Sequence, residues 1–392
     1  MTGVTSPKGF RAAGVAAGIK ASGAPDLALV VNDGPDATAA GVFTRNRVKA
    51  APVLWSQQVL RGGVLRAVVL NSGGANACTG PAGFQDTHAT AERTAASLRG
   101  PGVARLGLGA GEVAVCSTGL IGERLPMPAV LSGVDSAARG LSRDGGGRAA
   151  EAIMTTDTRP KTVTVAGSGY TVGGMAKGAG MLAPALATML CVLTTDAVAS
   201  TSVLREALGE ACRVTFDRLD SDGCMSTNDT VLLLASGASG IEPTAEELTE
   251  VVTRACADLA KQLLADAEGS TKDIAVEVTG AATEDEAVTV GRAVARSALV
   301  KTALYGNDPN WGRILAAVGT TDAAFAADAV DVAVNGVWVC RAGQAAEDRA
   351  KVDLSGREVS VVVDLHAGTA AATVWTNDLS LAYVHENSAY SS

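Results

Sequence analysis

The segment from Lys177 to Leu190 contains the residue types from which a self-cleaving nucleophile can be built. Gly178 and Gly180 make its approach flexible, a small Ala187 precedes Thr188, and the apolar run 189–193 is short enough to be a buried strand. If the Thr188 hydroxyl cleaves the bond after Ala187, the new chain begins with a threonine whose α-amino group can take the hydroxyl proton. Taken alone, a glycine-rich stretch before a strand is more often a turn.

Several further motifs occur in a fixed order along the chain. They are Cys116–Gly122, Ala152–Asp157, Asp266–Gly269, Val300–Ala303, Asp308–Arg313 and the terminal Glu386–Ser392. Together with the Lys177–Leu190 run, they resemble the signatures of the ornithine acetyltransferase family, also called glutamate N-acetyltransferases, of arginine biosynthesis. The resemblance covers nearly the whole chain. Several independent motifs in one order are far more specific than any single pattern.

The resemblance assigns roles to individual residues of this sequence. Thr188 matches the nucleophile, which would hold the acetyl group as an ester, and Thr118 and Gly119 match an oxyanion pair that acts through a hydroxyl and a backbone N–H. The matched substrate-binding positions are Thr155, Lys177, Thr188, Glu268, Asn387 and Ser392, with Thr156 as a neighbour.

The residues themselves leave simpler interpretations open. Ser117-Thr118-Gly119 could be an ordinary turn, and a lone lysine such as Lys177 is more often a solvated surface charge. Glu268 could be a solvated residue at a helix end, and Asn387 with Ser392 could belong to a frayed tail.

The resemblance implies that the enzyme moves acetyl from N2-acetylornithine to glutamate by a ping-pong route, without a metal or an organic cofactor. Some family members also accept acetyl-CoA as donor. Cleavage between Ala187 and Thr188 would give an N-terminal fragment, 1–187, and a C-terminal fragment, 188–392, which share a core and assemble as a heterotetramer. The alternatives are an amidase or aminopeptidase with water as acceptor, and a binding or scaffold protein that does not cleave itself.

Two features of the chain have no assigned role in the sequence. Before cleavage the nitrogen of Thr188 is an amide and cannot act as a base, so another group must assist the first cut, and the sequence does not name it. The second feature is the loop 222–230, where this chain has Cys224-Met225 and many family members have Asp-Thr. If this loop shapes the substrate pocket, its contacts differ here.

Composition excludes several classes of protein. The chain has 392 residues, 47% of them hydrophobic and 19% charged, and about 100–200 residues per domain makes two domains the default. A formal charge of −9 and the lack of basic runs oppose nucleic-acid binding. No apolar stretch is long enough to span a membrane and the N-terminus lacks a signal peptide's apolar core, so we expect a cytoplasmic protein.

Neither the histidines nor the cysteines predict a metal site. His88, His366 and His385 are far apart in sequence, and the seven cysteines are scattered without a C-x-x-C or zinc spacing, so we expect reduced core cysteines. We also expect Asp308–Arg313 to be a structural loop, because it is dense in turn-forming residues. The loop Asn71–Asn76 lacks the spacing of a phosphate-binding loop and is left outside the predicted site.

Periodicity and turn signals predict a mixed α+β fold. The expected helices begin near 148 and cover 87–98, 245–268 and 284–298, with capping-box patterns at Thr244 and Thr283. The expected strands are 27–31, 41–43, 67–70, 113–116, 189–193, 274–278, 359–365 and 372–376, with a hairpin at Asn335-Gly336. The family resemblance implies sheets sandwiched between helical layers, similar to N-terminal-nucleophile hydrolases.

Overall fold

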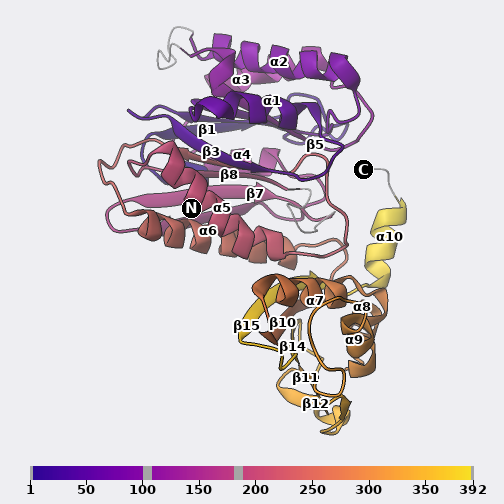
Figure 1. The fold of residues 1–392 in the computed structure, drawn as a ribbon. Coiled ribbons are helices and arrows are strands. Elements are labelled where there is room, and N and C mark those ends of the chain that lie inside the picture. The colour runs from indigo at the N-terminus through magenta and orange to yellow at the C-terminus, as the bar shows by residue number, and fades with distance from the viewer. Residues whose placement is uncertain (1–2, 100–107, 181–188, 390–392) are drawn as a thin grey trace.

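Two β-sheets face each other across a shared apolar core in the first two thirds of the chain, and helices cover their outer faces (Figure 1). A second, smaller unit contains a third sheet with its own helices. The structure is a computed structural model that describes residues 3–99, 108–180 and 189–389. The layered sheet sandwich that we expected is therefore confirmed.

The first two sheets are built largely from short apolar strands. In spatial order, sheet A consists of β1 (Phe10–Val15), β2 (Leu27–Asn32), β4 (Ala67–Ser72) and β5 (Val113–Thr118). Sheet B consists of β3 (Thr38–Phe43), β9 (Thr230–Ala235), β8 (Leu190–Thr195), β7 (Thr171–Lys177) and β6 (Lys161–Ala166). The strands β2, β4, β5, β8 and β9 are buried along their whole length, because each has a packed layer on both faces.

Helices complete both outer layers of the first unit. Sheet A packs against α1 (Ala51–Val59), α2 (Gly80–Ser97) and α3 (Met127–Arg139), and sheet B packs against α5 (Thr201–Val214) and α6 (Ala245–Ala265). The short α4 (Gly146–Ala152) contributes to the core between the sheets. The apolar stripe predicted for α6 is buried, and its capping box forms as expected between Thr244 and Glu247.

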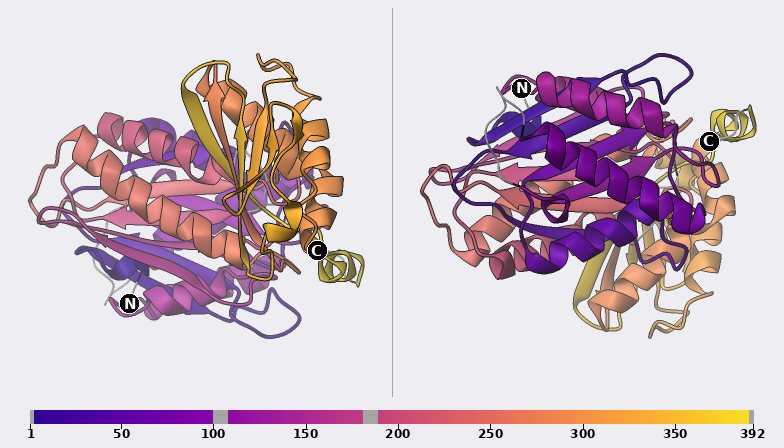
Figure 2. Two further views of the ribbon diagram at one scale, coloured as in Figure 1. Left: turned by 90° about the horizontal axis from the view of Figure 1, so that it is seen from below. Right: turned by 90° about the horizontal axis from the view of Figure 1, so that it is seen from above.

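The second unit follows α6 and lies at one end of the sandwich (Figure 2). In spatial order its sheet consists of β13 (Gln344–Ala345), β12 (Val337–Arg341), β11 (Asp331–Val334), β14 (Glu358–Asp364), β10 (Asp273–Ala281) and β15 (Ala370–Asn377). The helices α7 (Glu284–Arg296), α8 (Ala298–Tyr305) and α9 (Trp311–Val318) complete this unit. The last helix, α10 (Leu381–Ala389), stands beside both units in Figure 1.

Several local predictions are confirmed in the second unit. The Asn335-Gly336 hairpin joins β11 to β12, and both residues have the positive φ, 46° and 81°, that its tight turn requires. The Asp308–Arg313 segment, which we expected to be a structural loop, is a loop only as far as Asn310, because residues 311–313 form the first turn of α9. The Asn310 side chain caps this helix by accepting a hydrogen bond from the Arg313 N–H.

Other predictions need correction. The helix expected from residue 87 begins at Gly80, because Pro81 is favourable in a first helical turn. The helix expected to continue to residue 298 ends at Arg296. The next residue, Ser297, caps the start of α8. Thr283 caps α7, but Glu286 does not complete a capping box.

The cysteine prediction is wrong at two positions. Cys78 and Cys224 are exposed, whereas the other five cysteines are buried as expected. All seven are free thiols. Within the described ranges, no helix is long and apolar enough to cross a membrane.

Candidate functional site

Several strand ends meet at one end of the sandwich. Strand β7 runs antiparallel to β8, which places Lys177 opposite Leu190, and β8 runs parallel to β9, which places Leu190 opposite Thr230. Across the core, β5 of sheet A ends at Thr118, and the Lys177 Nζ lies 3.4 Å from the Thr118 Oγ1. The two sheets therefore bring the predicted oxyanion and substrate-binding positions together.

The Asn71–Asn76 segment, which forms the end of β4 and the loop after it, closely supports the backbone around Thr118 and Gly119. Gly119 has a φ of +129°, and a Cβ at this position would lie 2.5 Å from the Gly74 nitrogen. The Gly74 N–H donates to the Thr118 carbonyl oxygen at 3.0 Å. Glycine is therefore required at 119 for both conformation and space. The loop that we left outside the site forms the support of this pair.

Lys177 is 1% exposed, so its interpretation as a solvated surface charge is wrong. Burial lowers the pKa of its ammonium group, and the nearby carboxylates of Asp157, Asp229 and Glu268 oppose that effect. Its ammonium group donates toward the Thr118 Oγ1, which leaves the Thr118 hydroxyl proton available for another acceptor. The Thr118 hydroxyl can therefore donate to an oxyanion, together with the Gly119 N–H.

A buried charge network holds the end of β7 in place. The Lys161 ammonium group lies 2.6 Å from both Asp157 Oδ1 and Asp266 Oδ2. Asp157 also accepts from the Gly178 N–H at 2.7 Å and from the Thr155 N–H at 3.0 Å. The exposed Thr155 is thereby held beside the residues that follow Lys177.

This network predicts acid-sensitive stability. Burial alone would raise the pKa of Asp157, but the Lys177 and Lys161 charges and the Gly178 N–H outweigh it and lower the pKa from 3.8 to about 2. Because the pKa of Asp157 is lower in the folded state, its ionised carboxylate stabilises the folded protein by about 2 kcal/mol. This stabilisation is complete above the unfolded-state pKa and is lost as the pH falls toward 2.

Urea denaturation of wild type and Asp157→Asn checks this prediction. The difference in free energy of unfolding should be constant near neutral pH and shrink below about pH 4. Asp144→Asn, at an exposed aspartate, is the control and should show no such change. A difference that stays constant down to pH 2 would contradict the assignment.

Glu268 and Asn387 come from distant parts of the chain and meet beside the same segment. The Asn387 Nδ2 donates to Glu268 Oε2 at 3.0 Å, and the Glu268 N–H donates to the Ala179 carbonyl oxygen at 2.9 Å. A Cβ at Gly180 would lie 2.8 Å from the Glu268 carboxylate carbon, so a larger residue there would displace this carboxylate. These residues bring an acidic group to the edge of the Lys177 region.

Sequence reasoning missed several residues of this site. Asp157, Lys161, Asn228 and Asp229 join it through hydrogen bonds or buried charge. Of the predicted residues, Ala187, Thr188 and Ser392 lie outside the described ranges. Cys224, one of the two residues at which this chain differs from many family members, is exposed. Its loop is held by Asn46, whose Nδ2 donates to the Met225 carbonyl oxygen.

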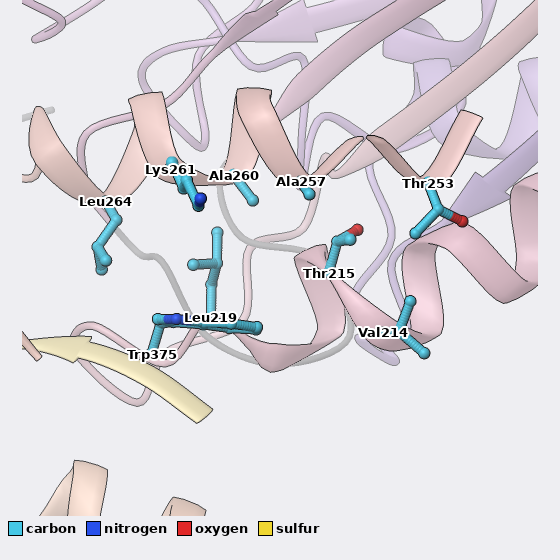
Figure 3. Close-up of a pocket in the computed structure, with 9 residues that line it drawn as sticks. All are labelled: Val214, Thr215, Leu219, Thr253, Ala257, Ala260, Lys261, Leu264 and Trp375. Carbon is cyan, nitrogen blue, oxygen red and sulfur yellow. The ribbon is translucent and has the colours of Figure 1, made fainter. Parts of the chain in front are cut away.

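A separate apolar pocket does not contain these residues. It has a volume of about 170 Å³ and lies between α5, α6 and β15 (Figure 3). Its lining consists of Val214, Thr215, Leu219, Thr253, Ala257, Ala260, Lys261, Leu264 and Trp375. In the part of the chain that the structure describes, no cluster of three or more His, Cys, Asp or Glu side chains is arranged to hold a metal ion.

Comparison with known proteins decides the family. The model of the ArgJ family matches residues 11–392, which is almost the whole chain. The chain belongs to the ArgJ family.

Two curated relatives agree with the assignment of this chain to the ArgJ family. The chain is 66% identical to the arginine biosynthesis bifunctional protein ArgJ of Streptomyces coelicolor, over 99% of this chain and 100% of that protein. It is 65% identical to the protein of the same name from Thermobifida fusca, with 99% of both chains covered. A solved ornithine acetyltransferase from Mycobacterium tuberculosis, complexed with ornithine, is 66% identical over 47% of this chain and 95% of that chain, with a TM-score of 0.44.

Proposed function

We propose that this ArgJ-family protein is a self-cleaving acetyltransferase that moves acetyl from N2-acetylornithine to glutamate. The observation that carries the proposal is the convergence of Thr118, Gly119 and Lys177 at the strand end where the described chain resumes with Met189. Thr188, the proposed nucleophile, is bonded directly to Met189. The name of the relative from Streptomyces coelicolor, an arginine biosynthesis bifunctional protein, agrees with the pathway to which this reaction belongs.

In the first half-reaction, the Thr188 hydroxyl attacks the acetyl carbonyl carbon of N2-acetylornithine. Its proton passes to the Thr188 α-amino group and then to the leaving nitrogen of ornithine as the C–N bond breaks. The Thr118 hydroxyl and the Gly119 N–H stabilise the oxyanion, and each donor of this kind contributes roughly 3–4 kcal/mol. Ornithine leaves, and Thr188 carries the acetyl ester.

In the second half-reaction, the amino nitrogen of glutamate attacks the ester carbonyl carbon, and the Thr188 hydroxyl is regenerated. Both substrates carry a carboxylate, for which the buried Lys177 supplies a cation. Glu268, held by Asn387, has the charge to bind the side-chain ammonium group of the ornithine substrate. With Thr155 and Ser392, these residues form the proposed substrate site.

Self-cleavage between Ala187 and Thr188 would leave two fragments that stay together. Strands β7 and β8 lie on opposite sides of that bond in sequence, yet they pair from Val172 with Thr195 to Lys177 with Leu190. The fragments 1–187 and 188–392 would therefore share a sheet and its core. We further propose a heterotetramer with two copies of each fragment, located in the cytoplasm, that can also use acetyl-CoA as a donor.

Product analysis tests the proposed function against the hydrolase alternative. With both N2-acetylornithine and glutamate present, ornithine and N-acetylglutamate should form in equal amounts. Release of acetate, whether or not glutamate is present, would favour an amidase or aminopeptidase. An intact chain with neither activity would favour a binding protein.

A further inference from the structure

Asp229 is fixed beside the proposed cleavage position by the register of the parallel strands β8 and β9. Because Leu190 lies opposite Thr230, Met189 and Asp229 are neighbours just before these strands begin. The Asp229 Oδ1 accepts a hydrogen bond from the Met189 N–H at 3.0 Å, and the Thr230 N–H donates to the Met189 carbonyl oxygen at 3.0 Å. The carboxyl group is therefore held against the peptide bond that joins Thr188 to Met189.

The second oxygen of this carboxyl group is unusual. Asp229 is 0% exposed, yet its Oδ2 has no hydrogen-bond partner among the described residues. A buried polar atom without a partner costs about 1–3 kcal/mol. Such a group is informative where it lies beside a reactive position, because a proton carrier needs one oxygen that is not already engaged.

Hydrogen bonds connect the surroundings of Asp229 to the oxyanion pair. Asn228 donates from its Nδ2 to the carbonyl oxygens of Ala75 and Ser117, both at 2.7 Å. Ser117 directly precedes Thr118. The Thr44 N–H donates to the Asp229 carbonyl oxygen at 2.9 Å. The strand end that carries Asp229 is thus tied to the backbone just before Thr118.

We infer that Asp229 carries the proton in the first, self-cleaving step, for which the sequence names no base. This inference rests on the proposed function, which places the cut between Ala187 and Thr188. The Met189 nitrogen is bonded to the carbonyl carbon of Thr188, so the hydrogen bond to Oδ1 engages the residue that directly follows the proposed nucleophile.

The step balances with water as its only co-reactant. The Asp229 carboxylate takes the Thr188 hydroxyl proton while the Thr188 oxygen bonds to the Ala187 carbonyl carbon. As the C–N bond between Ala187 and Thr188 breaks, the same proton passes to the Thr188 nitrogen, which becomes the free α-amino group. Water then hydrolyses the ester, which gives the Ala187 carboxylate and regenerates the Thr188 hydroxyl.

The charges around Asp229 suit this role. Burial raises the pKa of its carboxyl group well above the ordinary value, and the Met189 N–H, the Lys177 charge and hydrogen bonds from the Ser226 side chain and backbone oppose the rise. A carboxyl group with a raised pKa gains and releases a proton closer to neutral pH than an ordinary one. Two other titratable groups interact with Asp229. Lys177 donates toward Thr118 on the oxyanion side, and the Cys224 thiol has a pKa raised by burial and by the charges of Asp222 and Asp229.

Self-cleavage of the full-length chain, followed by intact mass after pulsed cell-free synthesis, tests the inference. Asp229→Asn keeps an oxygen for the Met189 N–H but cannot carry the proton, so cleavage should slow by about 100-fold or more. Asp229→Glu restores a carboxyl group and should recover part of the rate, with the rate rising as pH increases. Asp220→Asn is the matched control, because Asp220 is also buried with one unpartnered oxygen but its other oxygen accepts from Arg296 instead of from Met189.

The outcomes separate this inference from the proposed function. If Asp229→Asn is cleaved as fast as wild type, the role of Asp229 is overturned but the proposed function stands. Accumulation of a hydroxylamine-sensitive ester in that variant would have the same meaning, because the first step would then be intact. If the slow cleavage of Asp229→Asn came from misfolding, its melting temperature would fall and Asp229→Glu would not recover, which would also overturn it. An uncleaved wild-type chain would instead contradict the proposed function.

Discussion

Thr188→Ala should leave the chain as one uncut polypeptide and abolish acetyl transfer. The variant lacks the hydroxyl that attacks the Ala187 carbonyl carbon, and without cleavage it has no free α-amino group at 188 to serve as base. Both losses come from one side chain. Intact-mass analysis is the appropriate measurement, because fragments 1–187 and 188–392 are similar in size and a gel can show them as a single band.

The matched control for this variant is Thr302→Ala, which removes an exposed threonine hydroxyl from α8. It should cleave and turn over like wild type. A Thr188→Ala protein that still separates into the two fragments would rule out Thr188 as the nucleophile of self-cleavage.

Thr118→Ala should lower kcat by about 100-fold to 1,000-fold while KM changes much less. The Thr118 oxygen accepts a hydrogen bond from Lys177, and its proton is donated to the oxyanion that forms during the reaction. The hydroxyl therefore contributes little to binding of the unreacted substrate. The loss should therefore appear in the transition state. Steady-state kinetics with N2-acetylornithine and glutamate measure both parameters.

Thr118→Ser provides the conservative comparison, since it keeps the hydroxyl and should retain most of the activity. The backbone donor at Gly119 is unchanged in both variants. Near-normal turnover of Thr118→Ala would remove Thr118 from the oxyanion site. A rise in KM of about 100-fold or more with kcat unchanged would indicate a substrate-binding role instead.

Local signals in the sequence predicted much of the fold. Apolar runs such as 67–70 and 113–116 are strands, and the Thr244 capping box and the Asn335-Gly336 hairpin form where expected. These features depend on neighbouring residues, so one sequence is enough to find them. The early start of α2 was missed because Pro81, usually a helix breaker, occupies the first turn.

The site was predicted through resemblance, and its physical basis became visible only in the structure. Lys177 alone indicates a surface charge, because its burial depends on Asp157 and on the sheet that closes over it. The ion pair of Lys161 with Asp266 joins residues more than one hundred positions apart. The spacing of residues in the sequence does not predict such contacts.

Asp229 illustrates the same limit. The run Thr227-Asn228-Asp229-Thr230 resembles a polar turn, and its significance appears only when the register sets Asp229 beside Met189. The loop Asn71–Asn76 was likewise set aside, because its support of Gly119 is a contact between distant backbone segments that no motif encodes.

The acetyl ester of Thr188 is the central claim, and one measurement tests it directly. Processed enzyme mixed with N2-acetylornithine, without glutamate, should release ornithine and add one acetyl mass to the fragment that begins at Thr188. Added glutamate should then remove that mass and yield N-acetylglutamate. If the fragment mass never changes while products still form with both substrates present, transfer occurs directly in a ternary complex and the acetyl-threonine mechanism is wrong.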